Sequence, residues 1–156
     1  MSSETIVTAL FLISAVIAAG VLINAIFPAI YRTADTFGSV SSQADTKMRT
    51  DFRIVNTFAN ATTVKVWVKN VGSARLHTNE INTGDIYVGA PGNFERRSLS
   101  GRYTIEENTN SYWDPGETLT ITVTDAGDLL PGSGGDVYVA VVLPNGVRRD
   151  LTFTRS

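Results

Sequence analysis

Residues 6–30 read IVTALFLISAVIAAGVLINAIFPAI, a run with no charged side chain and with Thr8, Ser14 and Asn24 as its polar members. At about 1.5 Å per residue, a helix of this length spans ~37 Å and exceeds the ~30 Å hydrocarbon core of a bilayer. Because the run is apolar on every side, it predicts a membrane or filament-core helix. A secretory signal peptide is the other interpretation. It requires a basic N-terminal region and a shorter apolar run, and residues 1–4, Met-Ser-Ser-Glu, supply no basic residue.

The helical pattern continues beyond Pro28. Apolar or small residues recur there at spacings of three or four, at Tyr31, Ala34, Phe37, Ser41, Ala44, Met48 and Phe52. This spacing predicts an amphipathic continuation to about Arg49, hinged near Pro28 or Gly38. We therefore expect residues 1–50 to form one helical domain.

From Asp51 onward the hydrophobic period is two, which is the period of β-strands. Strands are predicted at 52–58, 64–71, 85–89, 95–98, 118–124, 136–143 and 147–154. A short turn at 60–62 and an Asn145-Gly146 hairpin turn connect two pairs of them. The interleaved Lys65 and Lys69 are expected to discourage pairing at a sheet edge. The fold class is therefore α+β, with a long N-terminal hydrophobic helix and an immunoglobulin-like antiparallel β-sandwich over 51–156.

Composition excludes several functional classes. A net charge of −2 with dispersed Lys and Arg leaves no basic field for nucleic acid. The absence of cysteine excludes disulfides, zinc–thiolate sites and cysteine nucleophiles. The single histidine, His77, is expected in an exposed loop within the polar stretch 73–84. No Walker, Rossmann or G-x-S-x-G pattern occurs, so we expect no enzyme, no catalytic residue, no cofactor and no metal.

Other polar and aromatic residues have ordinary structural explanations. Acidic residues near the C-terminal half are expected to form turns and not a calcium site, and these are Asp114, Glu117, Asp125, Asp128 and Asp136. The pair Glu106-Glu107 is expected to be solvated. Trp67 and Trp113 are expected in the core or at its edge, with a ligand-stacking platform as the alternative.

The whole chain resembles the archaellin superfamily. The resemblance is most specific over SETIVTALFLISAVIAAGVLINAIFPAIYRTADTFGSVSSQADTKMRTDFRIVN, where it is closest to the FlaG group of archaellum accessory proteins. It is architectural over VKVWVKNVGSARL, DIYVG, SYWDPGETLTITV and VYVAVVLPNGVRRDLTF. Archaellins and type IV pilins carry a short basic leader, which is not found before this apolar run. The resemblance therefore implies either a mature N-terminus or uncleaved insertion, and it favours an accessory protein over a major filament subunit.

The function implied is that of a structural archaellum component, an accessory or stator protein that self-assembles through its N-terminal helix. A filament subunit proper, whether archaellin or pilin-like, is one alternative. A membrane-anchored module that binds the S-layer or another envelope component is the other. Expected partners are other copies of the chain, the membrane, and another archaellum or S-layer protein. The β domain is expected outside the cytoplasmic membrane or in an extracellular filament. Arg32 alone opposes this topology by the positive-inside rule, and we give more weight to the exported character of the β domain.

Three sets of residues are candidates for these contacts. The assembly helix presents Glu4, Ile6, Ile13, Ile17, Gly20, Ile23 and Phe27. Small residues such as Gly20 permit close helix approach, and Glu4 either pairs with the amine of a neighbouring subunit or stabilises its own helix N-terminus. Asn60 begins the sequon Asn60-Ala61-Thr62 and is a possible glycosylation site. Phe94, Arg96 and Arg97 form a possible partner contact, because aromatic and arginine side chains are enriched at interface hot spots.

Overall fold

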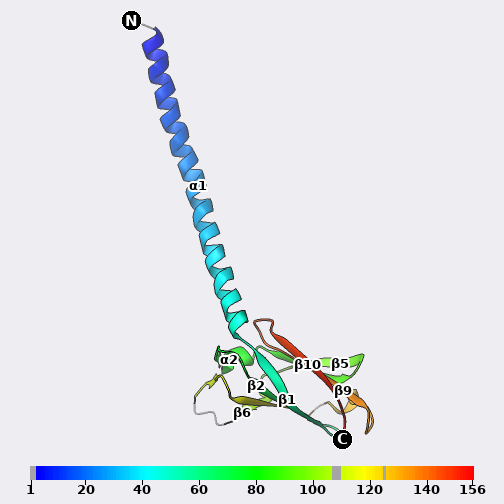
Figure 1. Ribbon diagram of the computed structural model, residues 1–156. Coiled ribbons are helices and arrows are strands. Elements are labelled where there is room, and N and C mark those ends of the chain that lie inside the picture. The colour runs from blue at the N-terminus through cyan, green and yellow to red at the C-terminus, as the bar shows by residue number, and fades with distance from the viewer. Residues whose placement is uncertain (1–2, 107–109, 125) are drawn as a thin grey trace. The chain divides into compact units, whose positions relative to one another are not determined.

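The computed structural model describes residues 3–106, 110–124 and 126–156, and the chain forms two compact units, Met1–Gln43 and Ala44–Ser156. Helix α1 runs from Ser3 to Arg49 (Figure 1). The expected end near Arg49 is confirmed. Neither Pro28 nor Gly38 interrupts the helix, although Pro28 lacks the N–H that would bond to the carbonyl one turn earlier.

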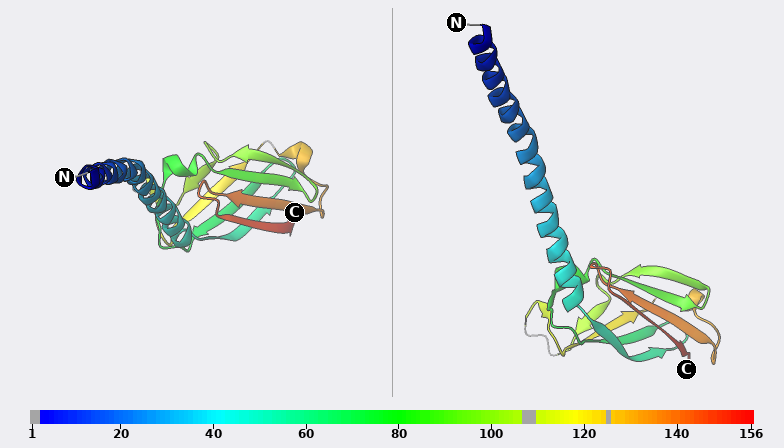
Figure 2. Two further views of the ribbon diagram at one scale, coloured as in Figure 1. Left: turned by 90° about the horizontal axis from the view of Figure 1, so that it is seen from above. Right: turned by 45° about the horizontal axis from the view of Figure 1, so that its top comes forward.

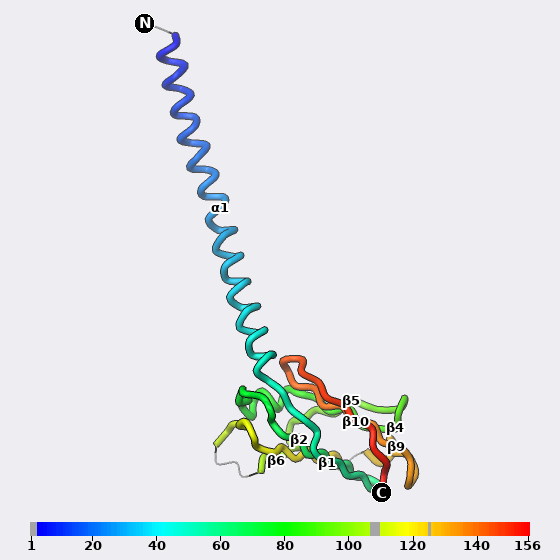
Figure 3. Tube along the Cα trace, in the orientation of Figure 1, coloured from blue at the N-terminus to red at the C-terminus, as the bar shows by residue number. Residues whose placement is uncertain are grey.

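The second unit contains two four-stranded antiparallel sheets, drawn in Figure 2. The first has the order β1 (Phe52–Ala59), β2 (Val64–Asn70), β8 (Thr118–Val123) and β6 (Tyr103–Ile105). The second has the order β10 (Arg148–Thr154), β9 (Asp136–Val142), β4 (Asp85–Ala90) and β5 (Asn93–Ser98). Figure 3 follows the chain as it passes from the first sheet to the second, returns to the first for β6 and β8, and ends in the second with β9 and β10. The α+β fold, a long apolar helix followed by antiparallel sheets, is confirmed.

The core lies between the two sheets because alternate residues of the central strands, such as β2 and β8, are buried. Val64, Val66 and Val68 of β2 are fully buried, while Lys65 and Lys69 between them are exposed. On the second sheet Val137 and Val139 are buried in the same way. Full burial of each such side chain stabilises the fold by about 1.5–3 kcal/mol. This alternation fixes which residues are available on the outer face of each sheet.

The predicted Asn-Gly turn is confirmed. Gly146 has a φ of +79°, and its N–H donates to the carbonyl of Leu143 at 2.9 Å. The N–H of Val147 donates to Oδ1 of Asn145 at 3.2 Å. This turn joins β9 to β10.

Several short elements were not expected from the sequence. Strands β3 (Leu76–His77) and β7 (Tyr112–Trp113) pair with each other, α2 covers Thr78–Ile81, and a 3-10 turn covers Gly127–Leu129. The prediction of an exposed loop for His77 is wrong, because the half-buried His77 lies in β3 and its Nδ1 accepts from the N–H of Asn79 at 3.1 Å. These elements were missed because two to four residues are too few to show a period.

The role predicted for Lys65 and Lys69 is also wrong. Strand β2 is an interior strand, paired with β1 on one side and with β8 on the other. The lysines therefore protect no sheet edge, and they project from the outer face of the first sheet.

Candidate assembly helix and partner surfaces

Within the described residues, the apolar part of α1 contains no buried side chain. The most apolar 18 consecutive residues of α1 have a mean hydropathy of 2.8, and none of them is buried. Within the described residues, α1 is the one helix that is long and apolar enough to cross a membrane. The six apolar or small candidates lie along this helix, and Ile6, Ile13, Ile17, Ile23 and Phe27 are each at least half exposed. A Cβ added at Gly20 meets nothing within 4 Å.

Two of the polar side chains of this segment, Thr8 and Ser14, are satisfied inside the helix itself. The hydroxyl of Thr8 donates to the carbonyl of Glu4, and that of Ser14 donates to the carbonyl of Leu10, each at 2.8 Å. A hydroxyl bonded in this way carries no unpaired donor into an apolar environment. Glu4 lies in the first turn, where a carboxylate is favoured by the helix dipole.

The sequon lies in an exposed turn between β1 and β2. Oδ1 of Asn60 accepts from the N–H of Thr62 at 3.0 Å and from that of Thr63 at 2.8 Å. The side-chain oxygen therefore holds the turn, and the amide nitrogen is left on an exposed residue.

The candidate contact residues on β5 are divided between two faces. Phe94 and Arg96 are on the outer face of the second sheet, opposite Gly89 and Tyr87 of β4, whereas Arg97 is opposite the inward-pointing Ile86. Arg97 is partly buried and bonds to Glu95 at 2.6 Å. A two-residue turn at 91–92 precedes β5, which includes the predicted strand 95–98.

On the outer face Phe94 joins an aromatic cluster that sequence reasoning missed. Its ring centroid lies 5.0 Å from that of Tyr138 on β9 and 6.3 Å from that of Tyr87 on β4. Nε of Arg96 donates to Oδ1 of Asp85 at 2.9 Å. This hydrogen bond and the negative charge of the Asp85 carboxylate raise the pKa of the Arg96 guanidinium. Phe94 remains 45% exposed, so the cluster presents an apolar surface beside a charged pair.

The C-terminal end of α1 is built into the second unit by backbone hydrogen bonds. The carbonyl of Arg49 accepts from the N–H groups of Ser73 and Ala74 at 2.9 and 3.0 Å, which caps the helix end. The carbonyl of Asp51 accepts from the N–H of Gly72 at 2.9 Å. Gly72 permits this approach, because a Cβ there would lie 2.5 Å from the Arg49 carbonyl oxygen.

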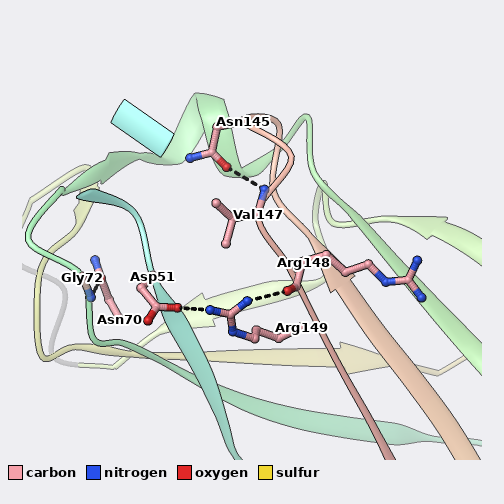
Figure 4. Close-up of polar contacts among 7 residues, drawn as sticks. All are labelled: Asp51, Asn70, Gly72, Asn145, Val147, Arg148 and Arg149. Atoms are coloured by element: carbon pink, nitrogen blue, oxygen red, sulfur yellow. Dashed lines mark hydrogen bonds and ion pairs between the residues drawn. The ribbon is translucent and has the colours of Figure 1, made fainter. Parts of the chain in front are cut away.

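Side chains extend this junction to both sheets, and Figure 4 shows them. Oδ1 of the buried Asn70 accepts from the N–H of Gly72 at 3.0 Å, and its Nδ2 donates to the carbonyls of Ala74 and Trp113. The carboxylate of Asp51 bonds to Nη2 of Arg149 on β10 at 2.6 Å. The helix end is therefore tied to the first sheet through Asn70 and to the second through Arg149.

Asp114 and Glu117, two of the acidic residues expected to form turns, take part in local structure. The N–H of Asp114 donates to Oε2 of Glu117, and Oδ2 of Asp114 accepts from Asn110, each at 2.8 Å. Glu107 and Asp125 lie outside the described residues. Within the ranges that the structure describes, no group of three or more His, Cys, Asp or Glu side chains is placed to hold a metal ion.

The sequence matches the archaeal-type flagellin family over residues 2–153. This chain belongs to that family. An uncharacterized protein of Archaeoglobus fulgidus is 33% identical over 162 aligned positions, which cover 99% of each chain.

Solved archaellum proteins share the fold of this flagellin-family chain. The archaeal flagellum of Methanospirillum hungatei strain JF1 matches with a TM-score of 0.71 and 16% identity, over 100% of this chain and 94% of that one. The archaellum periplasmic stator protein FlaG from Sulfolobus acidocaldarius matches with a TM-score of 0.52 and 21% identity, over 67% of this chain and 99% of that one. The stator protein complex of FlaF and FlaG from the same organism matches with a TM-score of 0.52 and 20% identity, over 65% and 87% of the two chains.

Proposed function

We propose that this flagellin-family chain is a structural, non-enzymatic component of the archaellum that self-assembles through α1. The observation that carries the proposal is the uncharged run 6–30, which is exposed on every side of the helix. Each exposed Ile, Leu, Val or Phe gains about 1.5–3 kcal/mol on leaving water. A helix surface of this kind requires cover, which lipid or other copies of the helix supply.

Lipid and a bundle of like helices are nearly equivalent environments for such a segment. Because both are apolar, transfer of the helix between them depends on packing and not on the hydrophobic effect. The row Ile6, Ile13, Gly20 and Phe27 recurs every seven residues and offers one packing face. We propose that this face, with Ile17 and Ile23 beside it, contacts other copies. We assign Glu4 to the neighbouring subunit's amine, because a carboxylate inside an apolar bundle requires a partner.

An accessory role of the FlaG type is the finer function that we favour. Similarity to the stator protein FlaG supports it, as does the family resemblance of residues 3–56. In this role the chain is held in the cytoplasmic membrane with its β unit outside the cell. The outer face around Phe94 and Arg96 then contacts another archaellum or S-layer protein, since arginine and aromatic residues dominate interface hot spots.

The second candidate is a filament subunit. Similarity to the Methanospirillum hungatei flagellum over the whole chain favours it. The two roles differ in where the chain is found in the cell. An accessory protein remains with the membrane when filaments are sheared from cells, whereas a filament subunit is a major component of the sheared material.

Quantitative mass spectrometry of the sheared filaments and of the membrane fraction from the native host tests these assignments. Recovery in the membrane fraction at a few per cent or less of the filament subunit supports the accessory role, and stoichiometric recovery in filaments supports the second candidate. Negative-stain micrographs of the purified chain after detergent removal test self-assembly itself. A chain that stays monomeric in every detergent and lipid would contradict self-assembly and favour a membrane-anchored envelope-binding module.

A further inference from the structure

The outer face of the first sheet carries three cations without counter-charges. Lys65 and Lys69 project from β2, and Arg53 projects from β1 directly opposite Lys69. All three are exposed, and within the described part of the chain none makes an ion pair or side-chain hydrogen bond. Several other arginines of the second unit are paired with carboxylates, among them Arg96 with Asp85 and Arg149 with Asp51.

This arrangement lowers the stability of the sheet. Side chains directly opposite on antiparallel strands lie about 4.5–5.5 Å apart at Cβ, and like charges at that distance repel. Edge protection does not explain the lysines, because β2 is an interior strand. Like charges placed opposite each other without a gain in packing or pairing are typical of a functional site.

The residues around the cations indicate what they bind. Trp67 lies between the two lysines on the same face and is only half-buried. The two lysines flank it at about 13 Å from each other, since four residues of a strand rise ~3.3 Å each. The neighbouring strand β8 places a threonine opposite each of these three residues of β2. Thr122 pairs with Lys65, Thr120 with Trp67, and Thr118 with Lys69. The hydroxyl of Thr120 donates to Oε1 of Glu106 at 3.2 Å, so the Thr120 hydroxyl proton is already used within the chain.

We propose that this face, defined by Arg53, Lys65, Trp67, Lys69 and the three threonines, binds an acidic polysaccharide. The cations match the carboxylates of such a polymer. The hydroxyls of Thr118 and Thr122 can donate to and accept from sugar hydroxyls, that of Thr120 can still accept, and the indole covers the apolar C–H face of a ring. An acidic protein fits less well, because lysine is depleted at protein–protein interfaces whereas this face has two. The site uses no residue of α1 or of the Phe94 cluster, so the proposal does not depend on the assembly role.

The test uses the full chain in neutral detergent micelles and polygalacturonate as the probe. Titration calorimetry at low ionic strength is expected to show binding that weakens as salt is added. Lys65→Thr and Lys69→Thr should each weaken binding about fivefold, the factor for one basic side chain at an anionic surface. Lys69→Thr should at the same time raise the thermal midpoint, since it removes the repulsion with Arg53. Trp67→Leu should also weaken binding, and Arg148→Thr on the second sheet is the matched control that leaves it unchanged.

Neutral polygalactan, poly-L-glutamate and vesicles of anionic lipid are the comparison ligands. Preference for polygalacturonate over all three, with loss in the Trp67 variant, supports the proposal. Equal binding of poly-L-glutamate, with no effect of Trp67→Leu, would show that the surface recognises negative charge without recognising sugar rings. That result would overturn the proposal. Preference for the vesicles would assign the face to membrane lipid and would overturn it too, as would the absence of polygalacturonate binding at low salt.

Discussion

Substitution of Gly72 by alanine should loosen the junction between α1 and the β-strands. The new Cβ would lie 2.5 Å from both the carbonyl oxygen of Arg49 and the amide nitrogen of Asp51. Because ordinary van der Waals contact begins at 3.4 Å, the two backbone segments must move apart by about 0.9 Å. Hydrogen bonds that now measure 2.9 Å would lengthen to roughly 3.8 Å, beyond bonding distance. The bonds at risk are those from Gly72 to Asp51 and from Ser73 and Ala74 to Arg49.

The expected loss follows from the number of bonds broken. Each backbone hydrogen bond contributes about 0.5–1.5 kcal/mol net, so the loss of these three bonds lowers the free energy of unfolding by about 1.5–4.5 kcal/mol. Urea unfolding of residues 44–156, followed by tryptophan fluorescence, should show a midpoint lowered by about 1–2 M. Trp113 is well placed to report it, because its carbonyl bonds to the buried Asn70.

Gly132→Ala is the matched control for this substitution. A Cβ at Gly132 meets nothing within 4 Å and its φ is not positive, so the change should be neutral or stabilising by up to about 1 kcal/mol. If Gly72→Ala unfolds at the same urea concentration as Gly132→Ala, the junction does not depend on close approach at Gly72. The capping of Arg49 would then contribute little to the fold.

Three further outcomes are expected. Ile17→Asp should abolish membrane retention and assembly, because a charge at the centre of a membrane helix costs about 2.5–3.5 kcal/mol. The control Ile17→Leu should preserve both, as measured by membrane fractionation and by negative-stain micrographs. Residues 44–156 should sediment as a soluble monomer, and stable oligomers of that fragment would move the assembly contact from α1 to the sheets. Protein purified from the native host should carry a glycan mass on the peptide with Asn60 that disappears in Thr62→Ala, and an unmodified wild-type peptide would remove Asn60 from the candidate sites.

The long elements were predictable because their hydrophobic period is sustained. The run 6–30 has no charge to interrupt it, and its continuation repeats every three or four residues up to Arg49. Strand β2 alternates over its whole length, and its three inward valines are fully buried. In contrast, β3 and β7 are two residues each and are held by their partner strand and not by their own sequence.

The partner surfaces were less predictable because they depend on which strands become neighbours. Phe94 was singled out beside Arg96 and Arg97, but adjacent residues on a strand point to opposite faces, so Arg97 lies apart from the other two. Tyr138 meets Phe94 although the two residues are 44 positions apart in sequence. The hydrophobic pattern gives the face of each residue and does not give the order of strands in a sheet.

Strand order also changes the structural explanation of Lys65 and Lys69. At a sheet edge, lysine is explained by protection against pairing with another chain. Within a sheet the same residue has no such role, and opposite Arg53 it adds repulsion. The sequence is the same in both cases, so only the pairing of β2 with both β1 and β8 shows that these cations require another explanation. Because that repulsion is relieved by an anion and by little else nearby, the face should become more stable when an acidic polymer binds or when Lys69 is removed. A variant that gains stability and loses binding together would link the two effects to one pair of residues.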